Sequence, residues 1–245
     1  MGKKGPPKHL KRHMSPAFWP IHRKEAVWAV RTSPGPHGAK VSTPLLVLLR
    51  DTLKYAQTAK EARMLIKEGK VVVDGKVRRS EKYPTGLMDV VWLPNANETY
   101  RVMPKHGGRF ILHSINREEA EYKLCRIIGK TTTDGGKIQL NLHDSRNIQL
   151  ENDGSQYAVN DILKIKLPEQ EILEKIDFKP GAKAIITGGI SQGTSGIIIG
   201  LGSEPGKKRT ATVRTDKDED VRTLASYVFA VGTEIPIISL PSADD

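Results

Sequence analysis

The chain has 245 residues and a mass of 27.1 kDa, which is enough for one to three small domains. Its 39 Lys and Arg residues outnumber its 28 Asp and Glu residues, so the net charge is +11 and the pI is near 9.6. One cysteine excludes a disulfide framework and every multi-cysteine zinc site, and no apolar run approaches the roughly 20 residues of a membrane-spanning helix. No apolar signal segment follows the basic N-terminus, so we expect a soluble protein of the cytoplasm.

The positive charge is concentrated in the first 93 residues. Residues 1–40 carry nine Lys or Arg against one Glu, and residues 41–93 carry ten against six acidic residues. Residues 94–175 balance twelve against twelve, and residues 176–245 carry eight against nine. Solubility alone needs no such separation of charge, so the pattern predicts a polyanionic partner that contacts the N-terminal half.

Residues 1–40 form a basic, proline-rich arm with too few aliphatic residues for a core of its own. Tryptophans are rare in purely disordered tails, so Trp19 and Trp28 are expected to dock on an apolar surface or to stack on bases. The glycine and proline cluster at residues 33–38 predicts a linker or a tight turn. The candidate polyanion-binding residues of the arm are Lys3, Lys4, Lys8, Lys11, Arg12, Arg23 and Lys24.

Residues 41–93 are predicted to form a helix-loop-helix followed by a β-hairpin. The first helix follows Thr43 and Pro44, which suit the N-cap and the first turn, and its leucines recur at helical spacing. Arg50 and Lys54 lie four residues apart and are expected on another face of this helix.

The second helix and the hairpin have clear boundary patterns. A capping box from Thr58 to Glu61 begins the helix, and Gly69 ends it. β-Branched residues on both sides of Asp74-Gly75 predict the hairpin, and a last strand at residues 88–93 closes the unit.

Packing the two helices through their apolar stripes leaves ten cations available on this unit and its hairpin. They are Arg50, Lys54, Lys60, Arg63, Lys67, Lys70, Lys76, Arg78, Arg79 and Lys82. If six to ten of them contact phosphates, affinity falls by about 10³–10⁵ between 50 and 200 mM salt. No pattern marks a recognition helix for the DNA major groove, whereas cationic contacts that follow shape suit folded RNA.

Short β-rich runs separated by turns make up the rest of the chain. Residues 94–175 are predicted to form a small sheet or barrel, and the closely spaced strands and glycine turns of residues 176–245 predict a five-stranded SH3-like barrel. The sequence therefore predicts an α+β multi-domain protein. Its parts are the arm at 1–40, the helix-loop-helix plus hairpin domain at 41–93, the central β-rich domain at 94–175 and the C-terminal barrel at 176–245.

Nothing in the sequence assembles into an active site. Residues 129–131 match the end of a phosphate loop, but the first glycine of the motif is missing and a turn is expected where a helix is needed. His106, His113 and His143 have no acidic or cysteine partner at metal-site spacing, and Cys125 is expected to be buried in a strand. We therefore expect no catalytic residue, metal, cofactor or small-molecule substrate.

Residues 43–93 resemble the RNA-binding domain first known from bacterial small-subunit ribosomal protein four. The matching residues are Leu49-Arg50-Asp51, Glu61-Ala62, Gly69 and residues 71–78. This domain also occurs in pseudouridine synthases, tyrosyl-tRNA synthetases and small stress proteins, so it implies RNA binding only.

The flanking residues narrow the resemblance to the archaeal and eukaryotic family of small-subunit ribosomal protein four. They are residues 5–12, Trp19, Arg23-Lys24, Trp28, residues 35–37, residues 83–90 and residues 122–125. Residues 181–196 resemble the KOW motif of ribosomal and transcription-elongation proteins, although the loop carries no cation. The resemblance runs from residue 2 to about residue 232, in the family's domain order.

The resemblance implies a structural constituent of the small ribosomal subunit, without catalysis, that supports subunit assembly and translation. The arm would become ordered on ribosomal RNA. Both the arm and the helix-hairpin unit would bind this RNA through the cations named above. The loop at residues 188–196 would add contacts to backbone or to RNA. The other partners would be neighbouring ribosomal proteins, and the location would be the ribosome in the cytoplasm. The C-terminus at Asp245 is earlier than in most eukaryotic members, which favours an archaeal source.

Two other classes remain open. An RNA-modifying enzyme could carry the RNA-binding domain as an appendage, and it would need a catalytic carboxylate such as Asp134, Asp144 or Asp161 beside a pocket. A free KOW-type transcription or translation factor could share the C-terminal barrel, and it would wash off the subunit in high salt.

Overall fold

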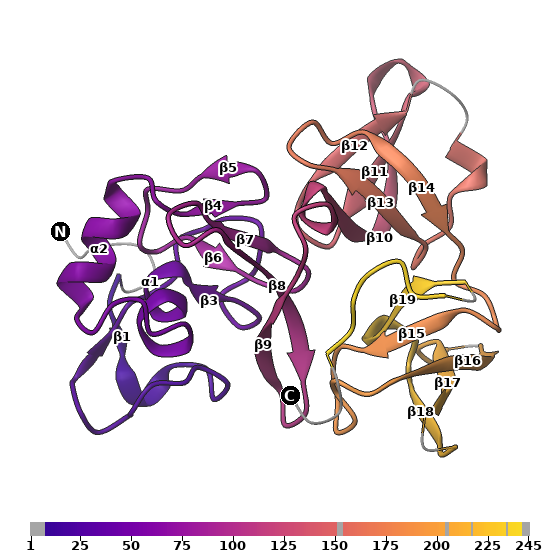
Figure 1. Cartoon of the computed structure of the whole chain (residues 1–245). Coiled ribbons are helices and arrows are strands. Elements are labelled where there is room, and N and C mark those ends of the chain that lie inside the picture. Colours follow the sequence, from indigo (N-terminus) through magenta and orange to yellow (C-terminus); the bar gives the residue numbers. More distant parts are fainter. Residues whose placement is uncertain (1–7, 151–153, 204–205, 217, 234, 242–245) are drawn as a thin grey trace, which may run out of the picture.

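The structure is a computed structural model that describes residues 8–150, 154–203, 206–216, 218–233 and 235–241. Figure 1 shows the N-terminal half on one side of the molecule and two β-rich modules, the central and the C-terminal one, on the other. In the described ranges, no helix is both long and apolar enough to cross a membrane. The longest α-helix there, α2, covers Ala59–Lys67.

The described part of the arm folds against the rest of the N-terminal half. Strands β1 (Leu10–Lys11) and β2 (Trp28–Ala29) pair with each other. The side chain of Trp19 is buried, and its indole N–H donates to the backbone carbonyl of Ser42 at 2.9 Å. The predicted docking of Trp19 on an apolar surface is confirmed, whereas Trp28 is 56% exposed. The arm therefore makes contacts within this chain through its β1–β2 pairing and Trp19.

The first helix differs from its prediction at both ends. Thr43–Pro44 is strand β3, which pairs with β6 (Pro84–Thr85), so Thr43 is not an N-cap and Pro44 takes that position. Helix α1 (Leu45–Val47) continues as a π-helix (Leu48–Thr52). The chain then turns at Lys54, whose φ of 57° lies in the left-handed region.

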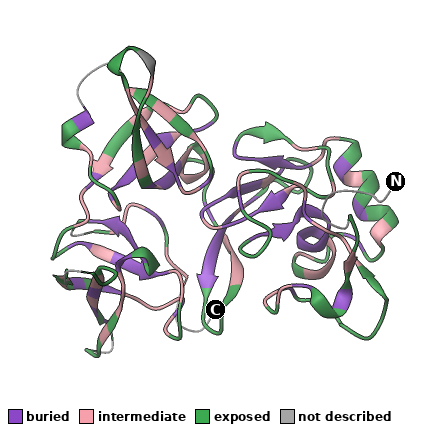
Figure 2. Cartoon of the chain, turned by 180° about the vertical axis from the view of Figure 1, so that it is seen from behind, coloured by how far each residue is buried: buried purple, intermediate pink, exposed green. Residues whose placement is uncertain are grey.

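The second helix begins as predicted. The hydroxyl of Thr58 accepts the backbone N–H of Glu61, and the Glu61 carboxylate accepts the backbone N–H of Thr58. Gly69 follows the helix with a φ of 80°, which a residue with a side chain rarely adopts. Ala62 and Ile66 are buried on the inner face, so the polar positions of α2 face outward (Figure 2).

Replacing Thr58 by alanine is expected to lower the free energy of unfolding by about 1 kcal/mol, because the first turn of α2 loses its side-chain cap. Urea denaturation followed by circular dichroism measures the change. Serine at the same position restores the hydroxyl acceptor and is expected to recover most of the loss. Equal losses for the alanine and serine variants would contradict a capping role.

A five-stranded antiparallel sheet follows, in the order β5-β4-β7-β8-β9. The predicted hairpin is confirmed: its turn, Asp74-Gly75, has positive φ at both residues, 51° and 73°. The sheet does not end at Leu93, because β8 pairs with β7 and brings the next hairpin into the N-terminal unit. The strands are β4 (Val72–Val73), β5 (Lys76–Val77), β7 (Val90–Leu93), β8 (Glu98–Lys105) and β9 (Arg109–Ser114).

The central module is a second five-stranded antiparallel sheet, ordered β12-β11-β10-β13-β14. Residues 129–131, expected to precede a turn, lie inside β10, and the pairing register shifts between Ile127 and Gly129. Within the described ranges, the 3₁₀ turn Asp134–Gly136 and no α-helix follows them, so these residues do not form a phosphate loop. The strands are β10 (Tyr122–Thr132), β11 (Ile138–Leu142), β12 (Asn147–Leu150), β13 (Ile162–Lys166) and β14 (Ile172–Ile176).

The C-terminal module contains the five strands that the sequence predicts, in an antiparallel sheet ordered β18-β17-β16-β15-β19. They are β15 (Lys183–Ile186), β16 (Ser195–Gly202), β17 (Thr210–Thr215), β18 (Asp220–Leu224) and β19 (Val228–Gly232). Short 3₁₀ turns elsewhere in the chain cover Arg12–Met14, Glu119–Glu121, Asp134–Gly136, Gly154–Gln156 and Ala225–Tyr227.

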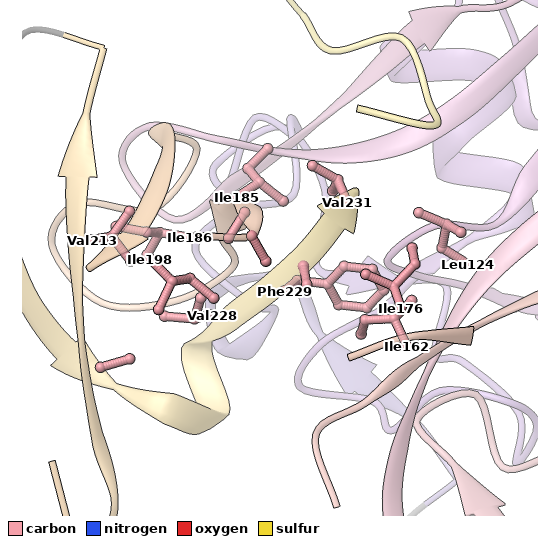
Figure 3. Close-up of a cluster of buried hydrophobic side chains, with 14 of the residues drawn as sticks. Leu124, Ile162, Ile176, Ile185, Ile186, Ile198, Val213, Val228, Phe229 and Val231 are labelled. Carbon is pink, nitrogen blue, oxygen red and sulfur yellow. The ribbon is translucent and has the colours of Figure 1, made fainter. Parts of the chain in front are cut away.

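One hydrophobic core joins the modules. Figure 3 shows Leu124, Ile162 and Ile176 of the central module beside Phe229 of the C-terminal module. The same cluster includes Met88 and Met103, which belong to the N-terminal unit. Burial of these side chains is the main favourable contribution to their packing. The shared core therefore fixes the β8–β9 hairpin against the C-terminal module.

Candidate nucleic-acid interface

The outer face of α2 carries a row of cations. Lys60, Arg63 and Lys67 are all exposed and follow the i, i+3, i+7 spacing that places residues on one side of a helix. They lie opposite the buried Ala62 and Ile66, which hold α2 against the N-terminal core. The predicted basic face of this helix therefore exists and is open to solvent.

A groove of about 400 Å³ runs along this face. One wall is formed by Arg63, Ile66 and Lys67 of α2, and the other by residues 79–82, which supply Arg79 and Lys82. The guanidinium of Arg63 also contacts the carboxylate of Glu81, which joins the two walls. Four cations thus surround an open groove that contains one acidic side chain, an arrangement that suits an extended polyanion.

The other cations of this unit differ in their availability. Lys76 and Arg79 are exposed, whereas Arg78 is half-buried and stacks on the ring of Tyr83 at 4.4 Å. Lys70 pairs with Glu68 at 2.6 Å. Arg78 therefore contributes to packing as well as to charge.

Arg50 and Lys54 are not on one helical face, which corrects the prediction. Arg50 is half-buried and pairs with Asp51 at 2.8 Å. The helix has ended before Lys54, whose left-handed backbone directs the chain away from the helix axis. A π-helical turn changes the angular spacing of side chains, so an i, i+4 argument fails there.

The arm cations are divided by burial. Lys8, Lys11, Arg23 and Lys24 are exposed. Arg12 is buried and pairs with Glu25 at 3.1 Å, so this candidate stabilises the fold of the arm instead of facing solvent. Lys3 and Lys4 lie outside the described residues.

Sequence reasoning missed a buried cluster of charges between the N-terminal unit and the central module, which we call the Lys123 cluster. It consists of Asp74, Asp89, Lys123, Asp144 and Arg146, together with His37, which pairs with Asp89. The Lys123 ammonium is fully buried and contacts all three carboxylates, at 2.8 Å for Asp74 and 3.1 Å for Asp144. Nε2 of His37, from the arm, lies 2.9 Å from a carboxylate oxygen of Asp89.

Electrostatics keeps Lys123, Asp89 and Asp144 ionised despite their burial. Burial lowers the pKa of Lys123, but the charges of the three carboxylates outweigh it and hold that pKa well above its ordinary value. Burial raises the pKa of Asp89, but Lys123 and His37 outweigh it and hold that pKa well below its usual range. The pKa of Asp144 is likewise lowered to about 2, because the charge of Lys123 outweighs the effect of burial. The cluster is therefore a structural junction between two modules.

The structure corrects the expectation that His143 has no cysteine or acidic neighbour. Ligand atoms of Cys125, His143 and Asp144 lie within 4.8 Å of one another, because β10 and the turn after β11 meet there. Both ring nitrogens of His143 already have hydrogen-bond partners, and the Asp144 carboxylate contacts Lys123 and Arg146. Burial also raises the pKa of the Cys125 thiol, so it stays protonated. These contacts favour packing over metal binding.

Three family models match successive parts of the chain. An RS4NT domain matches residues 4–40, an S4 domain matches residues 43–91, and the ribosomal family S4e matches residues 96–172. Small ribosomal subunit protein eS4 of Methanothermobacter thermautotrophicus is 46% identical over 235 residues, 96% of each chain. The chain belongs to the S4e family of ribosomal proteins.

Two further S4e proteins match most of the chain. The eS4 protein of Ignicoccus hospitalis is 46% identical over 97% of this chain and 96% of its own. The crystal structure of the 30S ribosomal protein S4e from Thermoplasma acidophilum has a TM-score of 0.66 at 32% identity, covering 78% of this chain and 95% of that one. The predicted family is confirmed, and with it the predicted class of function, a structural ribosomal protein of the small subunit.

Proposed function

We propose that this S4e protein binds ribosomal RNA through the cationic groove beside α2. The groove lies inside the range that matches the S4 domain, and Arg63, Lys67, Arg79 and Lys82 face it from two sides. Paired rows of cations can follow a phosphate backbone, and each phosphate contact releases counterions. The groove is the observation that carries this proposal.

Further RNA contacts are proposed for other cations of the arm and of the helix-hairpin unit. They are Lys3, Lys4, Lys8, Lys11, Arg23, Lys24, Arg50, Lys54, Lys60, Lys70, Lys76 and Arg78. Arg12 is assigned to the fold of the arm because of its pairing with Glu25. Since residues 8–40 already pack on the protein, the arm would present its cations in a fixed arrangement and lose less conformational entropy on binding.

The remaining modules would act as spacers and secondary contacts inside the particle. In this proposal the C-terminal module is an SH3-like KOW barrel, ribosomal proteins are the neighbours, and the ribosome of the cytoplasm is the location. No catalysis is proposed. Asp144 belongs to the Lys123 cluster, and Asp161 accepts the backbone N–H groups of Ala158 and Phe178, so these two carboxylates hold the fold together.

Replacing Arg63 and Lys67 together by alanine is expected to weaken binding to a small-subunit ribosomal RNA transcript of Methanothermobacter thermautotrophicus. Loss of two phosphate contacts lowers the slope of log Kd against log salt by about 1.8. Filter binding of the full chain at several KCl concentrations between 50 and 200 mM measures this slope.

The matched control is the double variant Lys137→Ala and Lys166→Ala, which removes the same charge from two positions of the central module whose side chains reach solvent. It is expected to keep the parent slope within about 0.5, since neither position belongs to the proposed surface. Equal slopes for both double variants would contradict the groove as the RNA site. Retention on the small subunit in a high-salt sucrose gradient separates a ribosomal protein from a free factor, which would dissociate.

A further inference from the structure

The turn between β8 and β9 is an exposed cationic tip outside the candidate groove. Lys105, His106 and Arg109 are exposed, and they flank Gly107 and Gly108. Both glycines have positive φ, 78° and 76°, and a Cβ built on either would meet nothing within 4 Å. The tip therefore offers cations and bare backbone to the solvent.

The loop at residues 188–193 packs directly on this tip, although it belongs to the C-terminal module. A Cβ on Gly193 would lie 2.7 Å from the backbone nitrogen of His106, so only glycine fits there. The side-chain amide of Gln192 donates to the backbone carbonyl of Arg109 at 3.0 Å. Figure 1 shows the β8–β9 hairpin extending from the N-terminal half toward the C-terminal module.

The two segments complement each other chemically. The loop at residues 188–193 contains no Lys or Arg, but it carries Ile190, whose side chain is 94% exposed. The tip supplies the cations that the loop lacks. An isoleucine so exposed beside a basic turn suits a partner with both charge and apolar surface, and the phosphates and base faces of RNA combine these.

We propose that the β8–β9 tip and the loop at residues 188–193 form one composite RNA-binding surface, separate from the groove beside α2. Arg109, with Lys105 and His106, contacts phosphates, and Ile190 packs on a base or a ribose. The inference rests on the proposed function, because it assigns a second contact with the same ribosomal RNA.

The test uses the full chain, the transcript described above and two single variants. Arg109→Ala is expected to lower the salt slope by about 0.9, so that the ratio of Kd values at 200 and 50 mM KCl shrinks by about threefold. Ile190→Ser is expected to weaken binding without changing the slope, because an apolar contact releases no counterion. The matched control is Lys137→Ala. Like Arg109, Lys137 is an exposed cation that directly follows two glycines with positive φ, here Gly135 and Gly136.

The outcomes are separable from those of the α2 groove. Parent-like binding by Arg109→Ala and Ile190→Ser, with weakened binding by the variant at Arg63 and Lys67, would overturn the composite surface and leave the groove in place. A parent chain with no salt-dependent affinity for the transcript would overturn both. An unchanged midpoint of urea denaturation confirms that Arg109→Ala folds, as expected for an exposed side chain.

Discussion

Replacing Lys123 by methionine is expected to lower the free energy of unfolding by about 3–5 kcal/mol at pH 7, the cost of removing one partner from a buried ion pair. Methionine is close in size, so the loss of charge dominates the effect. The ammonium is fully buried between Asp74, Asp89 and Asp144. Without it, the ion-pair partners that remain for the three buried carboxylates in the described part of the chain are Arg146 and His37.

Urea denaturation of the full chain measures this change, with Lys166→Met as the control. The side chain of Lys166 is 42% exposed and pairs with the half-exposed Glu169 side chain at 2.6 Å, and such surface pairs contribute little. A loss for Lys123→Met no larger than that of the control would show that the Lys123 cluster is dispensable. Because the cluster joins two modules, the variant is also expected to unfold in two transitions where the parent shows one.

The Lys123 cluster illustrates what the sequence alone could not predict. Asp74 has the local role that the Asp-Gly pattern assigns, since it forms the hairpin turn with positive φ. Its second role, binding Lys123 and Arg146, joins residues 49 and 72 positions apart in the chain. Local propensity contains no information on such pairings, so no local pattern places Lys123 beside Asp74.

Patterns that depend on local geometry were predicted well, and those that depend on packing were not. The predictions of the capping box at Thr58 and of the strands of the C-terminal module were correct, because both patterns follow from local backbone geometry. Thr43 was assigned to a helix because its pairing with Thr85 is 42 residues away. The basic face of α2 was predicted from spacing, but residues 79–82, the second wall of the groove, needed the tertiary structure.

The free energy of unfolding is expected to fall by about 1 kcal/mol per pH unit as the pH decreases from about 6.5 toward 4, and His143 is the reason. Its Nδ1 accepts the backbone N–H of Arg126 at 3.2 Å, and Nε2 lies 3.3 Å from the carbonyl oxygen of Leu87. Protonation breaks the first of these bonds. Burial, helped by the charge of Lys123, lowers the pKa of His143 to about 3.

The sign follows from proton binding in the two states. Between pH 6.5 and 3 the unfolded chain holds a proton on His143 that the folded chain does not, so acid favours unfolding. Asp89 and Asp144 act in a lower window: their folded pKa values lie below about 4, so their contribution is lost only as the pH falls from about 4 to 2.

Denaturation midpoints of the parent and of His143→Gln, measured from pH 7 down to about 2.5, therefore isolate the histidine. The variant is expected to lose the slope between about pH 6.5 and 4 and to keep the steeper acid loss below pH 4, which comes from Asp89 and Asp144. His22→Gln, at an exposed position of the arm, is expected to retain the parent slope. If His143→Gln also retained that slope, the pKa of His143 would not be lowered in the folded parent, and this imidazole would not be the source of the acid loss between about pH 6.5 and 4.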